Sequence, residues 1–224
     1  MIFFSKLWQY LPDFWHGLQL TVELTLVSAI VGFFCALPLV WGVIYGRKIT
    51  RIACNSYITV VRGTPMLVQL FFIYYGVPAL GLNLSPLTAA MIGFVLNSAA
   101  YQAEYLKGGF LAISTEQMEA GLSMGMSRYA VVRHVIFPQA LRFSLPALFN
   151  EIIYLVKYTS MAYIVQVPEL FAQAKFFASD TFMYLQTFIF IGCIYLIMIL
   201  GVTKLSDWLE KKMYIPGFDL SHLK

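Results

Sequence analysis

Five long apolar runs constrain this chain more than any other feature of its sequence. A helix needs about 20 mostly apolar residues to cross the roughly 30 Å hydrocarbon core of a bilayer, and its backbone polar groups must be satisfied within the helix. The 224 residues are 60% hydrophobic and only 12% charged, a balance unusual for a water-soluble globule. We therefore expect an all-α, polytopic membrane protein with five transmembrane helices, at residues 18–45, 57–80, 86–106, 141–165 and 181–205.

The lysines and arginines indicate the orientation, because cationic residues near helix ends are preferentially retained on the cytoplasmic side. Five spans place the two termini on opposite sides, and one of the two sets of polar segments holds only Lys6 and Lys175. We expect the N-terminus outside and the C-terminus in the cytoplasm. The net charge of +4 then reflects topology and requires no nucleic-acid partner. The expected cytoplasmic set is Arg47, Lys48, Arg51, Lys107, Arg128, Arg133, Arg142, Lys204, Lys211, Lys212 and Lys224.

Motifs for catalysis are missing from the sequence. It has no local Ser/His/Asp, HExxH or paired-carboxylate pattern, no GxxxxGK[ST] phosphate loop, and three cysteines without disulfide or metal spacing. A membrane-embedded enzyme is therefore disfavoured, and we expect no catalytic residues, no metal and no cofactor bound directly to this chain. If the protein works against a gradient, its nucleotide chemistry lies on another chain.

A polar segment at residues 114–138 interrupts the apolar pattern between the third and fourth spans. Ser114 and Gln117 have the spacing of a capping box and predict the start of a helix. Gly125 permits a turn, and Ser127 can cap a second helix. Pro138 lacks a backbone donor and is expected to separate that helix from the next span.

The faces of these two short helices differ. Met118, Leu122 and Met126 recur every four residues and predict an adaptable apolar face that could fill a cleft in a partner. The second helix has a buried stripe formed by Val131, Val132, Val135 and Ile136. An amphipathic loop lying on lipid headgroups is the alternative, and the basic residues of the segment would favour it too.

The same segment resembles a known sequence element. Glu119-Ala120-Gly121, then Gly125, then Ile136-Phe137-Pro138 is similar to the EAA loop of permease subunits in binding-protein-dependent ABC importers. The spacing fits throughout. Two positions depart from the family pattern: Gly121 stands where alanine is usual, and Phe137 where leucine is usual.

Flanking stretches resemble the polar amino-acid branch of that family, the histidine/glutamine/arginine type. Tyr158 departs from an aspartate common before the Thr-Ser pair, and Glu116 from a glycine before Gln117. The similarity covers most of the chain, at Gly17-Leu18, Thr21, Arg62-Gly63-Thr64-Pro65, Leu67, Gln69, Ala100-Tyr101, Glu104, Gly108-Gly109, Gln139-Ala140-Leu141-Arg142, Asn150, Lys157, Thr159-Ser160 and Glu169-Leu170.

This resemblance implies a bacterial inner-membrane permease subunit, one half of a paired pore whose other half is an identical or related chain. Two ATPase subunits would hold ATP and Mg, and an extracytoplasmic solute-binding protein would deliver a polar amino acid. The chain would form one transmembrane domain, residues 1–224, with its core at about 17–210 and a cytoplasmic coupling helix within 114–138. Closure of the ATPases would pull this segment and drive alternating access. The implied coupling residues are Met118, Glu119, Ala120, Gly121, Leu122, Gly125, Met126 and Pro138.

The second span contains a break signal at Arg62, Gly63, Thr64 and Pro65. Threonine is a good N-cap and proline is favoured at the first helical position, so we expect a helix to restart at Pro65 with Thr64 as its cap. Transporters tolerate broken helices where the freed backbone faces protein or a water-filled cavity. The alternative is a membrane-entry turn with Arg62 reaching headgroups.

Charged residues inside spans usually face a bundle interior and mark pathways. Glu23, Glu104, Glu151 and Lys157 qualify, and Glu151 is a candidate partner for a cationic amino-acid side chain. The alternative for the charged groups is snorkelling to the interface or support of packing. Polar residues share one face of the third span and one of the fourth. The predicted substrate pathway is Asn97, Tyr101, Glu104, Glu151, Tyr154 and Lys157.

Two further alternatives concern the exterior and the function. The segment at 166–180 is expected to face the exterior, where residues 165–179 form either a short gating segment or an interfacial aromatic anchor. A stand-alone secondary transporter or channel for a small polar solute is the alternative function. Five spans without an internal repeat argue against the usual architectures of that class.

Overall fold

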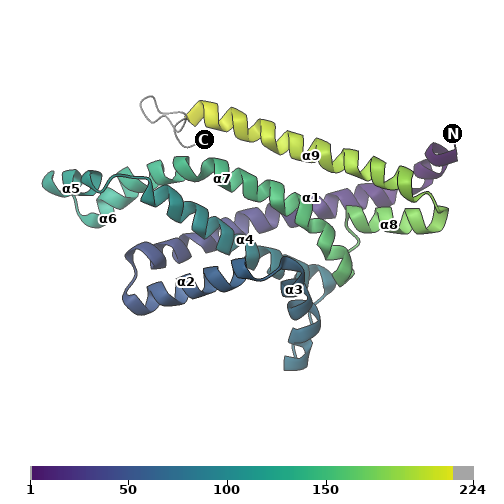
Figure 1. Ribbon diagram of the computed structural model, residues 1–224, viewed down its shortest axis with the longest axis horizontal. Helices are drawn as coiled ribbons and strands as arrows, with labels where there is room; N and C mark the ends of the chain where they lie inside the picture. The colour runs from purple at the N-terminus through teal and green to yellow at the C-terminus, as the bar shows by residue number, and fades with distance from the viewer. Residues whose placement is uncertain (1, 214–224) are drawn as a thin grey trace.

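The computed structural model describes residues 2–213, and every regular element in that range is helical (Figure 1). Met1 and residues 214–224 of the expected domain, including Lys224 of the basic set, lie outside the described residues. The long helices are α1 (Ile2–Tyr45), α2 (Lys48–Gly63), α4 (Pro86–Leu111), α7 (Phe137–Tyr158) and α9 (Tyr184–Met213). The shorter elements are α3 (Met66–Phe71), α5 (Glu116–Ser123), α6 (Arg128–Val131), α8 (Leu170–Thr181), the π-helical turns η1 (Phe72–Gly76) and η3 (Val132–Ile136), and the 3₁₀ helices η2 (Val77–Leu80) and η4 (Thr159–Val165).

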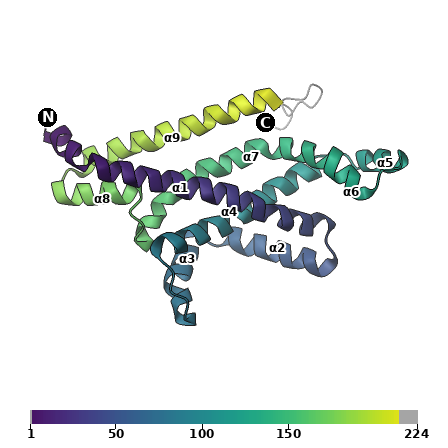
Figure 2. The ribbon, with the colours of Figure 1, turned by 180° about the vertical axis from the view of Figure 1, so that it is seen from behind.

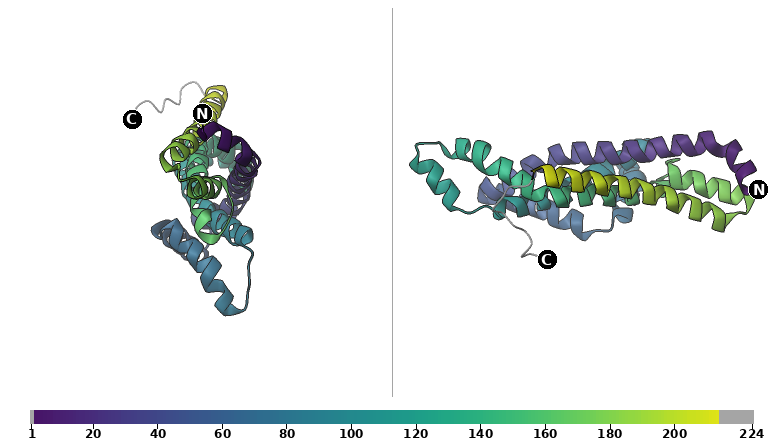
Figure 3. Two further views of the ribbon diagram at one scale, coloured as in Figure 1. Left: turned by 90° about the vertical axis from the view of Figure 1, so that its right-hand side faces the viewer. Right: turned by 90° about the horizontal axis from the view of Figure 1, so that it is seen from above.

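The long helices extend roughly along the long axis of the molecule (Figures 1 and 2). The short helices α5 and α6 lie at one end of that axis, and α8 lies at the other end beside the start of α1 (Figure 3). The connection between the third and fourth long segments is therefore far from α8. The segment between α4 and α7 and the segment between α7 and α9 therefore lie at opposite ends of the bundle.

Helix α4 is the centre of the bundle and packs against α1, α2 and α7. Small residues at the contact, such as Ala90, Ala100 and Ala103, are fully buried and allow the neighbouring backbones to approach closely. The polar residues of α4 also point inward, since Asn97, Ser98 and Gln102 are all buried. Interior polar groups of this kind are what a membrane-spanning helix keeps away from lipid.

The first helix starts earlier than the sequence predicted. The expected span began at residue 18, whereas α1 begins at Ile2 and continues through Pro12. Leu7 and Phe14 are buried against Phe177 of α8 and Ile191 of α9. The partners that order residues 2–17 are thus more than 150 residues away in sequence, where a local apolar pattern gives no sign of them.

The second segment is two helices at an angle. Helix α2 starts at Lys48, before the expected residue 57, and ends at Gly63, and the following segment from Met66 to Leu80 is turned from it by 104°. The expected cap was wrong, because the Thr64 hydroxyl donates to the Val60 carbonyl at 2.9 Å instead of capping the next helix. Pro65 occupies the N-cap position of α3.

By length and composition alone, two helices of the described part could cross a membrane. They are α1 from Phe3 and α9, and a third span results if the bent pair of α2 with Met66–Leu80 counts as one. Helices α4 and α7 fall outside this group. Each carries polar residues that are buried inside the bundle, such as Gln102 and Glu151.

Candidate functional site: a projecting helical connection and a polar cavity

The connection between α4 and α7 is a pair of short helices at the end of the molecule (Figure 3). Gly125 adopts a φ of +81° in the turn between α5 and α6, a conformation that glycine adopts at low cost. The Ser127 side chain accepts a hydrogen bond from the Ala130 backbone N–H at 3.2 Å and caps α6. The predicted turn and the predicted second cap are both confirmed.

The start of α5 differs from the prediction. Thr115 occupies the N-cap position, and the Ser114 hydroxyl accepts from the Glu116 N–H, so the capping box between Ser114 and Gln117 does not form. The amides of Gln117 and Gln139 instead exchange two hydrogen bonds, of 3.1 and 2.7 Å. Gln117 therefore holds α5 to the start of α7, a tertiary role that outweighs the local cap.

The predicted apolar face of α5 is divided between the interior and the surface. Met126 lies beyond the end of α5, so it does not share the predicted helical face. Met118 and Met126 are partly buried and pack on the protein's own core, while Leu122 is 38% exposed. Glu119 and Ala120 are exposed, and Met124, in the turn, is 75% exposed. The exposed surface available to a partner thus includes Glu119, Ala120, Leu122 and Met124, whereas Met118 and Met126 pack on the core.

Pro138 does not separate the second short helix from the next span. Helix α6 passes through the π-helical turn η3 directly into α7, which already includes Pro138 in its first turn. Proline is tolerated in the first turn of a helix, and a π-helical turn alters the hydrogen-bond pattern just before it. Helix α6, the turn η3 and the following helix α7 therefore form one continuous helical rod.

The break between α2 and α3 is held by Gln69, which the resemblance included but to which the sequence assigned no role. The Gln69 amide donates to the Val61 carbonyl at 2.7 Å and to the Thr64 carbonyl at 2.9 Å, and its oxygen accepts from the Asn97 amide at 3.2 Å. Gln69 thus satisfies carbonyls freed by the break and ties it to α4. A break in a helix leaves backbone carbonyls that need a hydrogen-bond donor from within the protein. A nearby side-chain amide is therefore the signal that could have identified Gln69.

Arg62, the last charged residue of α2, lies beside α4. Its guanidinium is 3.5 Å from the Glu104 carboxylate and lies over the Tyr101 ring at 5.3 Å. Lys107 contacts the same carboxylate at 3.1 Å. Glu104 therefore carries two cationic partners within this chain.

A cavity of about 280 Å³ lies at the break and brings part of the predicted pathway together. Polar groups from three helices converge on it, so a small polar molecule could find both hydrogen-bond donors and an aromatic surface there. Its lining is Arg62, Gly63, Thr64, Pro65, Met66, Asn97, Tyr101 and Tyr158.

The remaining pathway residues lie on α7 in different surroundings. Glu151 is only 2% exposed and faces Ser98 of α4. Tyr154 is exposed, and the Lys157 ammonium lies 4.3 Å from the centre of its ring. Lys157 lines a separate cavity beside α9. Within one chain, Asn97 and Tyr101 therefore meet Tyr158, whereas Lys157 is directed elsewhere.

Residues 28–214 match the family described as binding-protein-dependent transport system inner membrane component. The chain belongs to this family. Such permease subunits are transport proteins, and the ATPase of the system is a separate chain. The helical bundle is therefore an ABC permease fold, with the projecting connection and the polar cavity as its candidate functional parts.

Curated relatives of this permease cover nearly its whole length. It is 37% identical to the probable amino-acid permease protein YxeN of Bacillus subtilis, over 93% of this chain and 96% of the relative. It is 33% identical to the glutamine transport system permease protein GlnP of Escherichia coli, over 94% and 97%. Another relative is the nopaline transport system permease protein NocM of Agrobacterium fabrum, at 33% identity over 88% and 87%.

Solved structures give the same family. The permease matches a crystal structure of an amino acid ABC transporter with histidines at a TM-score of 0.87 and 35% identity, covering 94% of this chain and 98% of the other. It also matches an inward-facing structure of the MetNI methionine ABC transporter at a TM-score of 0.79 and 20% identity, over 92% and 99%. The second match concerns the fold alone.

Proposed function

We propose that this permease carries a polar amino acid into the cell and that the α5–α6 connection is its contact with the ATPase. Three relatives are named for the transport of nopaline, glutamine and cystine, all of which are amino acids or amino-acid derivatives. The observation that carries the proposal is the projecting α5, whose Glu119 and Leu122 are exposed just before the turn that leads into the α6–η3–α7 rod.

The proposed topology has five spans. They are α1, the bent pair α2 with α3, then α4, α7 with η4, and α9, with the N-terminus outside and the C-terminus in the cytoplasm. Arg47, Lys107 and Arg142 support this orientation, because cationic side chains favour the cytoplasmic ends of spans. The coupling helix α5 is then cytoplasmic, within the proposed segment 114–138, and α8 lies toward the exterior.

The mechanical step follows from the packing of the coupling segment. An ATPase that contacts Glu119, Ala120 and Leu122 moves α5, and the paired amides of Gln117 and Gln139 carry the motion to α7. The continuous η3–α7 rod then shifts the side chains of α7 relative to α4. Alternating access follows when the two ATPases close and reopen as rigid bodies.

The proposed complex contains this chain twice or with a related permease, two ATPase subunits that hold ATP and Mg, and an extracytoplasmic binding protein. One permease chain presents one polar cavity, so a two-fold pair would place two such cavities beside a shared passage. The bilayer and the amino acid complete the set of partners.

Of the two carboxylates in the predicted pathway, Glu151 is the better candidate to contact the side chain of the substrate. Glu104 is already paired with Arg62 and Lys107, whereas Glu151 has no ion-pair partner within residues 2–213. A buried carboxylate that forms no ion pair favours a cationic ligand. We propose that Glu151 faces the side chain of an arginine, lysine or histidine substrate, with a neutral amino acid such as glutamine as the alternative.

Purification from native membranes tests the proposal. A tagged permease should recover an ATPase subunit, and the reconstituted complex should hydrolyse ATP faster when a loaded binding protein is added. A panel of amino acids on that binding protein identifies the substrate by the size of the stimulation. Recovery of the permease without any ATPase would contradict the proposed function.

A further inference from the structure

Two segments separated by about 150 residues of chain meet at the end opposite to α5. The Leu170 backbone N–H, at the start of α8, donates to the Thr21 hydroxyl of α1 at 3.2 Å. A Cβ at Gly17 would lie 2.8 Å from Gln173 Cγ and 3.1 Å from the Glu169 carbonyl oxygen. Since only a glycine permits this approach, α8 is seated directly on α1.

The Glu169 carboxylate is fully buried at this junction. Its two oxygens accept from the Ala172 and Phe171 backbone N–H groups at 2.8 Å each, which makes Glu169 the N-cap of α8. A third hydrogen bond reaches another helix, because the Tyr195 hydroxyl of α9 donates to the carboxylate at 3.2 Å. One side chain therefore starts α8 and fastens α9 to it.

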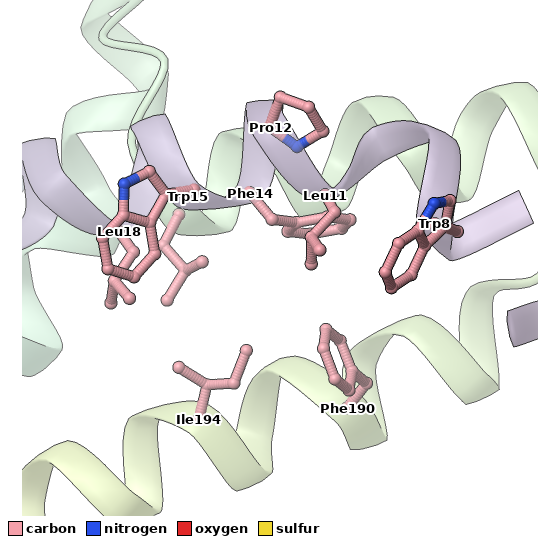
Figure 4. A pocket seen from close by; sticks show the side chains of 9 residues that line it. Trp8, Leu11, Pro12, Phe14, Trp15, Leu18, Phe190 and Ile194 are labelled. Atoms are coloured by element: carbon pink, nitrogen blue, oxygen red, sulfur yellow. The ribbon is translucent and has the colours of Figure 1, made fainter.

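Open space lies near this contact on two sides. A groove of about 510 Å³ separates α1 from α9, and Figure 4 shows Leu18 and Trp15 on α1 facing Ile194 across it. A second cavity, of about 290 Å³, is lined by Tyr195 itself together with Phe171 and Lys157. Helix α9 is therefore less tightly packed around Tyr195 than α8 is on α1.

Both ends of α8 are marked by unusual backbone geometry. Gln166 and Phe182 have φ values of 68° and 58°, and they are the two non-glycine residues with positive φ among residues 2–213. Such conformations are sparsely populated for residues with a side chain and persist where the surrounding structure imposes them. The chain turns sharply before and after α8. Helix α8 therefore packs more extensively against α1 than against its neighbours along the chain, η4 and α9.

We propose that Glu169 is a positioning residue that holds the exterior end of the permease closed, with α1 and α8 as one unit and α9 as the part that separates. Opening breaks the Tyr195–Glu169 hydrogen bond, while the two backbone hydrogen bonds of the carboxylate remain. Because the buried carboxylate stays satisfied by these two donors, the contact can be released without unfolding α8. The inference rests on the proposed transport function.

The Tyr195→Phe variant tests this role, because it removes one hydroxyl and leaves the α8 cap intact. Tyr184→Phe is the matched control, since Tyr184 is an exposed tyrosine on the same helix. The readout is ATP hydrolysis by the reconstituted complex, measured without binding protein and with binding protein loaded with arginine or with glutamine. Loss of a hydrogen bond to a charged group should raise the unstimulated rate of Tyr195→Phe by about fivefold or more, and leave Tyr184→Phe unchanged.

A double-mutant cycle that combines Tyr195→Phe with Glu169→Gln separates the effect of the Tyr195–Glu169 hydrogen bond from a general loss of stability. If the two groups act through one hydrogen bond, the effects of Tyr195→Phe and Glu169→Gln on the unstimulated rate should not be additive. Thermal unfolding of each purified complex identifies variants that only lose stability. If Glu169→Gln does not assemble, the comparison of Tyr195→Phe with Tyr184→Phe tests the positioning role of Glu169 alone.

The outcomes distinguish this inference from the proposed function. A wild-type complex that responds to loaded binding protein, with Tyr195→Phe behaving as Tyr184→Phe, overturns the positioning role of Glu169 and leaves the transport function intact. A wild-type complex without any ATPase activity overturns the transport function itself. A raised unstimulated rate in Tyr195→Phe alone supports the inference.

Discussion

Gly121 of α5 lies so close to Val131 of α6 that a Cβ at Gly121 would be 2.5 Å from Val131 Cγ2. Val131 is fully buried, so its methyl groups have little room to move. The EAA loops that this segment resembles carry alanine at the position of Gly121. The departure therefore has a physical reason here, because the branched side chain of Val131 fills the space of the missing methyl group.

Gly121→Ala should weaken coupling between ATP hydrolysis and transport. The added methyl group must displace Val131 or push α5 away from α6, and overpacking of this kind costs about 1–3 kcal/mol. Transport in reconstituted vesicles should fall, and the Gly121→Ala/Val131→Ala double variant should recover part of it. Gly108→Ala is the control, since a Cβ there meets nothing within 4 Å. A transport rate in Gly121→Ala equal to that of the control would contradict the packing argument.

Gly125→Ala should also impair the connection, for a different reason. A Cβ at Gly125 meets nothing within 4 Å, but the φ of +81° disfavours a side chain, at a cost of about 1–2 kcal/mol. Gly125→Asn should be milder, because asparagine is enriched in the left-handed region. The thermal unfolding midpoint of the purified complex and the stimulated ATPase rate should both be highest with glycine at position 125, lower with asparagine and lowest with alanine. Equal values for the two variants would count against backbone strain as the cause.

Gln69→Leu should destabilise the break between α2 and α3. The leucine leaves the carbonyls of Val61 and Thr64 and the amide of Asn97 without this partner. Asn97 is buried, and an unsatisfied buried polar group costs about 1–3 kcal/mol. We expect a lower unfolding midpoint and slower transport. Gln186→Leu, at an exposed position of α9, should leave both unchanged. If the two variants unfold at the same temperature, Gln69 does not hold the break.

Glu151→Gln should reduce uptake of a cationic amino acid more than uptake of a neutral one. The amide keeps the size of the side chain and removes the charge proposed to face the substrate, and a lost charge contact weakens binding by about tenfold for each 1.4 kcal/mol. Uptake of radiolabelled arginine and glutamine into vesicles measures the difference. Equal reductions for both amino acids would exclude a direct charge contact at Glu151.

Local backbone requirements in the connection could be predicted from the sequence. The turn at Gly125 and the cap at Ser127 depend on residues within a few positions, and both predictions are confirmed. Helices at all five apolar runs also followed from composition and length. Their role as five spans stays a prediction.

Tertiary partners account for the features that the sequence did not predict. Gln117 pairs with Gln139, 22 residues away, so it does not complete the expected capping box. A four-residue period predicts one helical face for Met118, Leu122 and Met126, but it does not reveal that α5 ends at Ser123 or that Met118 and Met126 pack on the protein's own core. Residues 2–17 join α1 because of contacts with α8 and α9. In each case the deciding contact is between segments that are distant in sequence.

Photo-crosslinking from the turn beside α5 is the most direct test of the proposed coupling. A photoreactive amino acid at Met124, which is 75% exposed at the end of the connection, should form a covalent adduct with the ATPase subunit in native membranes. The same amino acid at Leu80, which is 76% exposed on the segment that follows α2, should give no such adduct. Crosslinks from Met124 to lipid alone, with no ATPase adduct, would contradict the proposal that the ATPase drives this permease through α5.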